Sequence, residues 1–178
     1  VEFALDLGGA TGMCGVLMSQ VADHVMVTDL SPGLLTHATE FLSTTGRARS
    51  FETRVMNVIS IDLPSDSVDI AASNAVTHYL TFEEKMVFYR EVHRVLKSGG
   101  RYYEPQQEKP DEMSMYTVSQ RGMLAKHVTS AVLATRGDVV IQDQILGLPN
   151  PEQFGFKTLS VVYQQNPFIK QIMQLTKI

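Results

Sequence analysis

Apolar and polar positions alternate along the first half of the chain in a way that predicts strands and helices in turn. An apolar opening run ends in a glycine-rich stretch at residues 5–12. A pattern of helical spacing follows, and a second apolar run at residues 24–29 ends in an acid. Short apolar runs bounded by turn residues are typical of buried strands. The alternation continues to about residue 103 and predicts a parallel sheet with helices on both faces.

The clearest helix is predicted over residues 81–97. Thr81 and Glu84 have the spacing of a capping box, and Gly99 follows as a stop signal. An apolar stripe at helical spacing is expected to pack against the sheet, and it consists of Phe82, Met86, Tyr89 and Leu96.

The last part of the chain has a less regular pattern. Residues 104–112 are polar with two prolines and predict a loop, and residues 113–135 predict a further helix. Two β-rich runs follow at residues 156–164 and 168–178. The Asn-Pro pair between them indicates a hairpin.

The composition fits one globular domain. The chain has 178 residues, 44% hydrophobic and 19% charged, which is enough to bury roughly 70% of the unfolded surface. A formal charge of −4 gives no basic face for a polyanion, so nucleic acid is not an expected partner. One cysteine excludes an internal disulfide and suits the cytoplasm. No run approaches the roughly 18 apolar residues of a membrane span, and no signal peptide is visible.

The glycine-rich stretch indicates a nucleoside site. A strand, a glycine turn and a helix let backbone N–H groups approach a ligand, and an acid ending the next strand can accept hydrogen bonds from ribose hydroxyls. The dinucleotide spacing G-x-G-x-x-G fails because its last glycine falls on Met13 or Cys14. The segment from Asp6 to Gly12 reads D-x-G-x-A-x-G instead. It resembles motif I of the class I S-adenosylmethionine-dependent methyltransferases.

This resemblance extends in order over about the first 105 residues. Four further parts of the family's pattern have counterparts here. They are the second strand with the following helix, the end of the third strand, the approach to strand four and the helix end before strand five. They lie at residues 25–35, 55–58, 63–70 and 91–101. The chain looks most similar to the small-molecule subgroup that includes ubiquinone and menaquinone biosynthesis methyltransferases.

The resemblance implies an α/β fold, a three-layer Rossmann-like sandwich. Its mostly parallel seven-stranded sheet would end in an antiparallel C-terminal strand, and residues 154–156 resemble the family's turn into strand six. One methyltransferase domain is expected over residues 1–178. Residues 1–105 would form the cofactor-binding half, and residues 106–178 would supply an acceptor-side helix and the C-terminal strands.

The resemblance also implies a site for S-adenosyl-L-methionine. The glycine turn would lie under the methionine and ribose, Asp6 would act on the ammonium through the turn, and Asp29 would bind the ribose. Asn57 stands where the family usually has an acid at the adenine. The residues expected to bind the cofactor are Asp6, Gly8, Gly9, Ala10, Gly12, Asp29, Leu30, Asn57, Val58, Ser73 and Asn74. Asp6, Asp29 and Asn57 are each also ordinary strand-end or turn residues. Ala10 is expected to keep a negative φ, because glycines flank it.

The acceptor side has fewer signals. Methyl transfer from a sulfonium is an in-line displacement that depends on positioning, so no metal is expected. His78 is a candidate catalytic base, or it only starts the next helix. Glu104 either meets a cationic amine as a catalytic residue or caps a loop. Cys14 is either a thiol of lowered pKa or a small packing residue.

The sequence thus predicts methyl transfer to a small-molecule acceptor that is neutral, apolar or cationic. The alternative is a non-catalytic methyltransferase-like subunit that binds a partner protein, or the cofactor in a regulatory role. A nicotinamide oxidoreductase is disfavoured because the dinucleotide spacing fails and no Tyr-x-x-x-Lys pair occurs.

Overall fold

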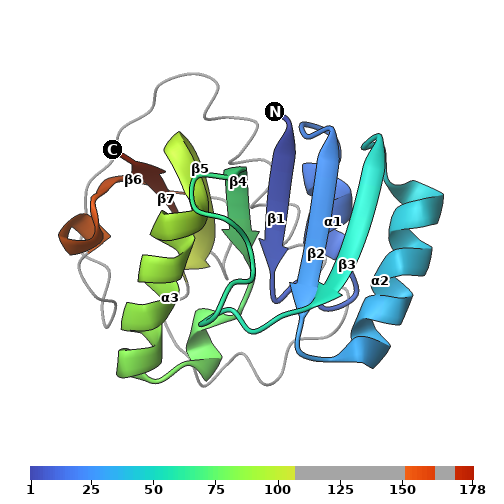
Figure 1. The fold of residues 1–178 in the computed structure, drawn as a ribbon, viewed down its shortest axis with the longest axis horizontal. Coiled ribbons are helices and arrows are strands. Elements are labelled where there is room, and N and C mark those ends of the chain that lie inside the picture. Colours follow the sequence, from blue (N-terminus) through green and yellow to red (C-terminus); the bar gives the residue numbers. More distant parts are fainter. Residues whose placement is uncertain (107–150, 163–170) are drawn as a thin grey trace.

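The computed structural model of the protein describes residues 1–106, 151–162 and 171–178 (Figure 1). Strands and helices alternate as predicted, except that β3 leads to β4 without a helix. In chain order the elements are β1 (Phe3–Leu7), α1 (Met13–Met18), β2 (His24–Asp29), α2 (Pro32–Thr45), β3 (Ser50–Val55), β4 (Val68–Ser73), the 3-10 helix η1 (Thr77–Tyr79), α3 (Phe82–Val95), β5 (Leu96–Gln106), the 3-10 helix η3 (Pro151–Phe154), β6 (Phe156–Val162) and β7 (Gln171–Lys177).

Within the described residues, seven strands form one sheet in the order β3-β2-β1-β4-β5-β7-β6. The neighbours from β3 to β5 are parallel, whereas β7 runs antiparallel to both β5 and β6. This arrangement confirms the predicted mostly parallel sheet with an antiparallel C-terminal strand. The two β-rich runs pair with each other, and the proposed turn between them lies outside the described residues, as does the helix predicted over 113–135.

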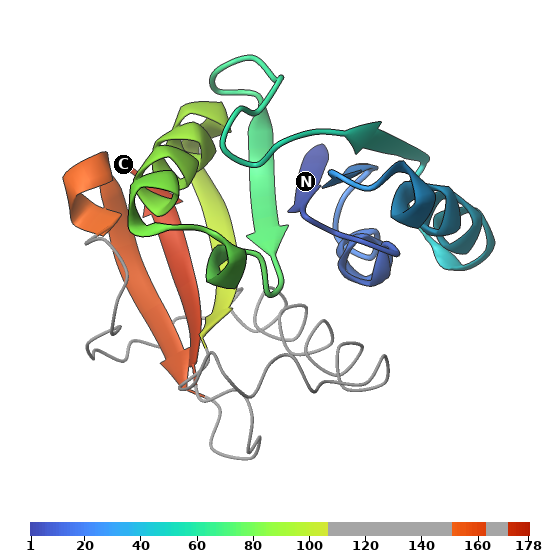
Figure 2. The same ribbon diagram turned by 90° about the horizontal axis from the view of Figure 1, so that it is seen from below.

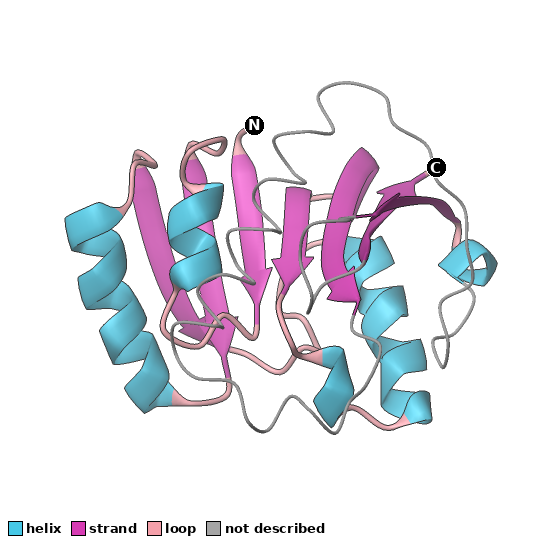
Figure 3. Ribbon diagram, turned by 180° about the vertical axis from the view of Figure 1, so that it is seen from behind, coloured by secondary structure: helices cyan, strands magenta, loops and turns pink. Residues whose placement is uncertain are grey.

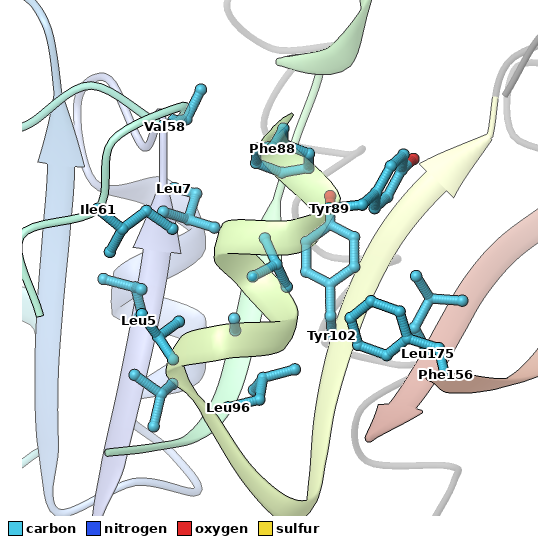
Figure 4. Close-up of a cluster of buried hydrophobic side chains, with 14 of the residues drawn as sticks. Leu5, Leu7, Val58, Ile61, Phe88, Tyr89, Leu96, Tyr102, Phe156 and Leu175 are labelled. Atoms are coloured by element: carbon cyan, nitrogen blue, oxygen red, sulfur yellow. The ribbon is translucent and has the colours of Figure 1, made fainter. Parts of the chain in front are cut away.

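The pleat of β1 divides the core between the two faces of the sheet (Figure 2). Ala4 packs in a cluster with residues of α1 and α2, whereas Leu5 and Leu7 pack in a cluster with residues of α3. Successive side chains of a strand point to opposite faces, so one central strand supports both helix layers. The cluster under α3 includes the large side chains Phe88, Tyr89, Tyr102 and Phe156 (Figure 4).

Helix α3 begins as predicted and ends earlier than predicted. The Thr81 hydroxyl accepts from the Glu84 N–H at 3.2 Å, and the Glu84 carboxylate accepts from the Thr81 N–H at 2.8 Å, which confirms the capping box. The helix ends at Val95 instead of residue 97, because Leu96 already pairs with Val68 of β4. The predicted end signal at residue 99 therefore falls inside β5.

The buried face of α3 also differs from the predicted stripe. Phe82 is 56% exposed because it stands at the first position of the helix, well before the first buried residue. Leu96 is buried, but in β5 and not in the helix. The buried helix face consists of Phe88, Tyr89, Val92 and Val95.

Glu91 and Arg94 fasten the segment between β3 and β4 to α3. The Glu91 carboxylate accepts from the Ile61 N–H at 2.8 Å. Arg94 donates to the carbonyls of Ile61 and Leu63 at 2.6 and 2.7 Å, and to Glu91 at 2.8 and 2.9 Å. Hydrogen bonding from Arg94 holds the pKa of Glu91 below its usual range. The pair therefore positions the loop that begins at Asn57.

Strand β5 runs to Gln106, so the predicted loop does not begin at Glu104. The extension is explained by β7, which pairs with β5 from Arg101 to Gln106 and satisfies its backbone groups. In the described part of the chain, no helix is long and apolar enough to cross a membrane.

Candidate cofactor and acceptor site

The carboxyl ends of β1 and β4 lie side by side at the centre of the sheet. From β1 the chain order continues outward through β2 and β3 on one side, and from β4 through β5 on the other. The arrowheads of β1 to β4 point to the same edge in Figures 1 and 3. Ligands of open parallel sheets bind outside such a switch point. The loops that follow β1, β2, β3 and β4 therefore form the candidate site.

The glycine turn after β1 requires small residues because the side chains of Val76 and Asp6 lie close to its backbone. Gly8 has a φ of 67°, and a Cβ there would lie 2.4 Å from Cγ2 of Val76, in the loop after β4. A Cβ on Gly9 would lie 2.5 Å from Oδ2 of Asp6. The turn is thus packed between its own strand and the loop of the adjacent strand.

Ala10 and Gly12 also have positive φ angles, 48° and 82°. The expectation of a negative φ at Ala10 is wrong. The Ala10 N–H donates to Oδ2 of Asp29 at 3.1 Å, and the Gly9 N–H donates to the Thr28 carbonyl at 2.8 Å. These two hydrogen bonds to β2 hold the turn in the left-handed region, where an alanine costs roughly 1 kcal/mol relative to glycine.

Asp29 joins the loops that follow β1 and β2. Besides the bond from Ala10, its Oδ1 accepts from the Ser31 N–H at 2.9 Å. A carboxylate offers about four lone-pair positions, so acceptor capacity remains for a ligand's hydroxyl groups. Leu30 follows directly in the chain, and its apolar side chain is 65% exposed.

Asp6 is fully buried on the α1 side of β1, next to the glycine turn. Neither carboxylate oxygen has a hydrogen-bond partner of normal geometry. Burial raises the pKa of Asp6 to about 7, against a lowering effect of the Gly15 N–H, and the charge of Asp29 raises it further. Burial and the Asp6 charge raise the pKa of the Cys14 thiol well above its usual value. Cys14 therefore fits the packing alternative and not the reactive one.

Asn57 and Val58 follow β3 in the next loop. Asn57 is exposed, and its Oδ1 accepts from the Ile59 N–H at 3.1 Å. The side chain of Val58 is 8% exposed and belongs to the cluster under α3. Of these two side chains, that of Asn57 is the one open to a ligand.

Ser73 and Asn74 stand at the carboxyl end of β4, and their side chains differ in environment. The Ser73 hydroxyl is fully buried, 2.6 Å from the hydroxyl of Tyr102. The Asn74 Oδ1 is buried and has no hydrogen-bond partner in the described structure. An unpaired buried acceptor costs about 1–3 kcal/mol until a donor meets it.

His78 and Glu104 occupy different positions at this edge. His78 lies in η1, between β4 and α3. Glu104 is 2% exposed, and its carboxylate accepts from the hydroxyls of Thr77 and, at 2.8 Å, of Tyr89. Burial raises the pKa of Glu104, and the hydrogen bonds from these hydroxyls oppose that rise.

Thr77 and Val76 support the loop of the site, and Tyr89 binds Glu104 from the helix side. The sequence did not identify these three roles. Thr77 and Val76 lie in a loop without a motif, and Tyr89 reads as one position of an apolar helix stripe. Their partners are 27, 68 and 15 residues away in the chain, so no local spacing reveals them. Among the described residues, no group of three or more His, Cys, Asp or Glu side chains is arranged to hold a metal ion.

The family model described as a methyltransferase domain matches residues 5–103. The chain therefore belongs to this family. A comparison with curated proteins gives no match. The fold is similar to that of the TehB-like SAM-dependent methyltransferase from Corynebacterium glutamicum, with a TM-score of 0.61 and 16% identity over 99% of this chain and 80% of that one.

Two further solved structures illustrate the range of the fold. A SAM-dependent methyltransferase from Methanosarcina mazei has a TM-score of 0.63 and 17% identity, covering 99% of this chain and 92% of that one. An rRNA methylase from Streptococcus thermophilus has a TM-score of 0.59 and 14% identity, covering 99% and 87%. The family match and the sheet topology define a SAM-dependent methyltransferase and imply S-adenosylmethionine as its cofactor.

Proposed function

We propose that this protein transfers a methyl group from S-adenosylmethionine to a small-molecule acceptor at the carboxyl edge of β1 and β4. The observation that carries the proposal is a hydrogen bond between the turn after β1 and the end of β2. The left-handed glycine turn after β1 is hydrogen-bonded through Ala10 to Asp29 after β2. This arrangement brings backbone N–H groups and the carboxylate that we propose to bind the ribose to one place.

The polar groups of the site fit the groups of the cofactor. Asn74 Oδ1 lacks a donor, which an ammonium group supplies, and a cation near the turn would favour the ionised form of Asp6, whose pKa is raised to about 7 by burial. Asp29 retains lone pairs for the ribose hydroxyls, and Leu30 and Asn57 offer exposed side chains to the adenine. In the proposed site the remaining contacts come from the backbone of Gly8, Gly9, Ala10, Gly12, Val58 and Ser73.

The proposed reaction is an in-line displacement. When bound, S-adenosylmethionine supplies an activated methyl group on a sulfonium. The protein holds the nucleophile at about 3–3.5 Å from the methyl carbon, and such positioning contributes roughly 7–11 kcal/mol to lowering the barrier. We propose His78, carried by η1 at the same edge, as the base that takes the acceptor's proton.

The proposed acceptor is a neutral, apolar or cationic small molecule with an oxygen, nitrogen or carbon nucleophile. The formal charge of −4 disfavours a polyanion. The ordered motifs at residues 63–70 and 91–101 support the small-molecule subgroup that resembles ubiquinone and menaquinone biosynthesis methyltransferases. The single cysteine supports the cytoplasm as the proposed location.

Calorimetric titration with S-adenosylmethionine, S-adenosylhomocysteine and NAD tests the cofactor site. The first two ligands are expected to bind saturably and to compete, because S-adenosylhomocysteine keeps the ribose, adenine and amino-acid groups. A preference for NAD, or a folded sample that binds none of the three, would contradict the proposal.

Transfer of a tritiated methyl group to panels of quinols, phenols, amines and RNA tests the acceptor. Labelling of a small molecule is the expected result. Preferential labelling of RNA would overturn the small-molecule part. Tight cofactor binding without transfer to any panel would favour the non-catalytic alternative.

A further inference from the structure

A buried carboxylate with hydroxyl partners lies behind the loop that follows β4. Glu104 of β5 accepts from Thr77 of η1 on one oxygen and from Tyr89 of α3 on the other, at 2.8 Å. The ring centroid of Tyr102 lies 6.2 Å from that of Tyr89 (Figure 4). Tyr102 extends the group, because its hydroxyl lies 2.6 Å from the Ser73 hydroxyl. The group therefore links β4, η1, α3 and β5.

The loop at residues 74–77 lies between this buried group and the glycine turn. On one side, the Thr77 hydroxyl is bound to Glu104. On the other side, Val76 packs so closely on Gly8 that a Cβ on the glycine would lie 2.4 Å from its Cγ2. Asn74, with its unpaired buried Oδ1, starts the same loop. A shift of the Thr77 anchor would therefore be transmitted to both the glycine turn and Asn74.

Core stability alone does not account for an acid at this place. Burying a carboxylate is costly, and well-packed apolar residues of similar volume are often at least as stabilising. A buried carboxylate does fix the orientation of the hydroxyl groups that donate hydrogen bonds to it. Among the hydroxyls that interact with Glu104, the one from Thr77 leads to the loop of the candidate site and the one from Tyr89 leads to the helix. Tyr102 also interacts with the carboxylate and contacts Ser73 at the end of β4.

We propose that Glu104 is a positioning residue that acts through Thr77. It sets the 74–77 loop against the glycine turn and so determines affinity for the amino-acid end of the cofactor. This inference rests on the proposed function. It assigns Glu104 a role without contact to the acceptor, in agreement with its 2% exposure.

Two probes that differ only in the amino-acid end test the inference in the full chain. S-adenosylhomocysteine carries that end, and 5′-methylthioadenosine lacks it. Thr77→Val removes the hydroxyl with little change in shape. It is expected to lower the affinity for S-adenosylhomocysteine about tenfold and the affinity for 5′-methylthioadenosine less than about threefold. Thr77→Ser keeps the hydroxyl and is expected to restore wild-type affinity for both probes.

Tyr89→Phe is the matched control, because it removes a hydrogen bond to the same carboxylate on the helix side. It is expected to lower the free energy of unfolding while S-adenosylhomocysteine affinity stays within about threefold. Equal weakening of both probes by Thr77→Val, or equal effects of Thr77→Val and Tyr89→Phe, would reduce Glu104 to a core residue. Should Thr77→Val not fold, Val76→Ala loosens the same loop from the other side and carries the same expectation.

The outcomes separate the inference from the proposed function. A wild-type protein that binds neither probe overturns both. A wild-type protein that binds S-adenosylhomocysteine, with a Thr77→Val variant of unchanged affinity, overturns the inference alone.

Discussion

The Ala10 N–H donates to Oδ2 of Asp29 at 3.1 Å and so ties the turn after β1 to the turn after β2. The same carboxylate accepts from the Ser31 N–H at 2.9 Å through its other oxygen. Asp29 therefore shapes the backbone of the site, and it is also the proposed acceptor for the ribose hydroxyls. This double role sets the first two predictions.

Replacement of Asp29 by Ala is expected to weaken S-adenosylmethionine by roughly 1.5–3 kcal/mol, because hydrogen bonds from two ribose hydroxyls to a carboxylate are lost. The free energy of unfolding should also fall by about 1–2 kcal/mol, since two backbone N–H groups lose their acceptor. Calorimetry and urea unfolding measure the two effects. Asp23→Ala, which removes an exposed partner of Arg49, is the control and should leave cofactor affinity unchanged. Equal affinities for Asp29→Ala and wild type would place the ribose elsewhere.

Replacement of Ala10 by Gly relieves a positive φ of 48°. The relief of roughly 1 kcal/mol is offset by the greater freedom of glycine in the unfolded chain, about 0.4–1 kcal/mol. We therefore expect the free energy of unfolding to change by less than about 0.5 kcal/mol, and cofactor affinity to rise or stay equal. Ala10→Val should lose both stability and affinity, because a β-branched residue tolerates this conformation poorly. A glycine variant that binds the cofactor more weakly would show that the alanine methyl contacts it.

Replacement of Gly9 by Ala places a Cβ 2.5 Å from Oδ2 of Asp6. The backbone must shift, so a loss of about 1–3 kcal/mol in unfolding free energy is expected, together with weaker cofactor binding. Gly33→Ala is the matched control, since its Cβ would meet only the Ser31 hydroxyl at 3.9 Å. That change lies in α2 and should be neutral or stabilising by up to roughly 1 kcal/mol. Similar losses in the two variants would contradict the packing of the glycine turn.

Asp6 makes stability depend on pH. Burial raises the pKa of Asp6 from 3.8 to about 7, so between these values the folded protein binds a proton that the unfolded chain has lost. The contribution of Asp6 to the free energy of unfolding is fully present below about pH 4 and is lost as the pH rises through 7. Urea unfolding measures this effect. Between pH 4 and pH 8, the free energy of unfolding of Asp6→Asn should rise by roughly 2–4 kcal/mol relative to that of the wild type. Parallel pH profiles for the two proteins would contradict the buried, unpaired state of Asp6.

His78→Ala tests the proposed base. Turnover of an identified acceptor is expected to fall by roughly 100-fold, while calorimetry should give unchanged cofactor affinity. His37→Ala is the control, because that histidine lies on α2 and is mostly exposed. Full activity in His78→Ala would leave the enzyme with catalysis by positioning alone.

Features that depend on residues close together in the chain could be predicted from the amino-acid sequence. The glycine turn, the acid that ends β2 and the capping box of α3 are local patterns, and each occurs where it was predicted. Alternating apolar runs and helical patterns also predicted the parallel part of the sheet, because a strand buried on both faces must be apolar.

The interactions between these local elements depend on the fold of the whole chain. The φ of Ala10 follows from hydrogen bonds to β2, and the end of α3 follows from the pairing of Leu96 with Val68. The environments of Asn74 and Glu104 depend on contacts between segments far apart in the chain. Such contacts are set by strand register and helix packing, which no spacing within one segment specifies. For this reason the sequence predicted a nucleoside site, and the folded structure showed which of its polar groups still lack partners.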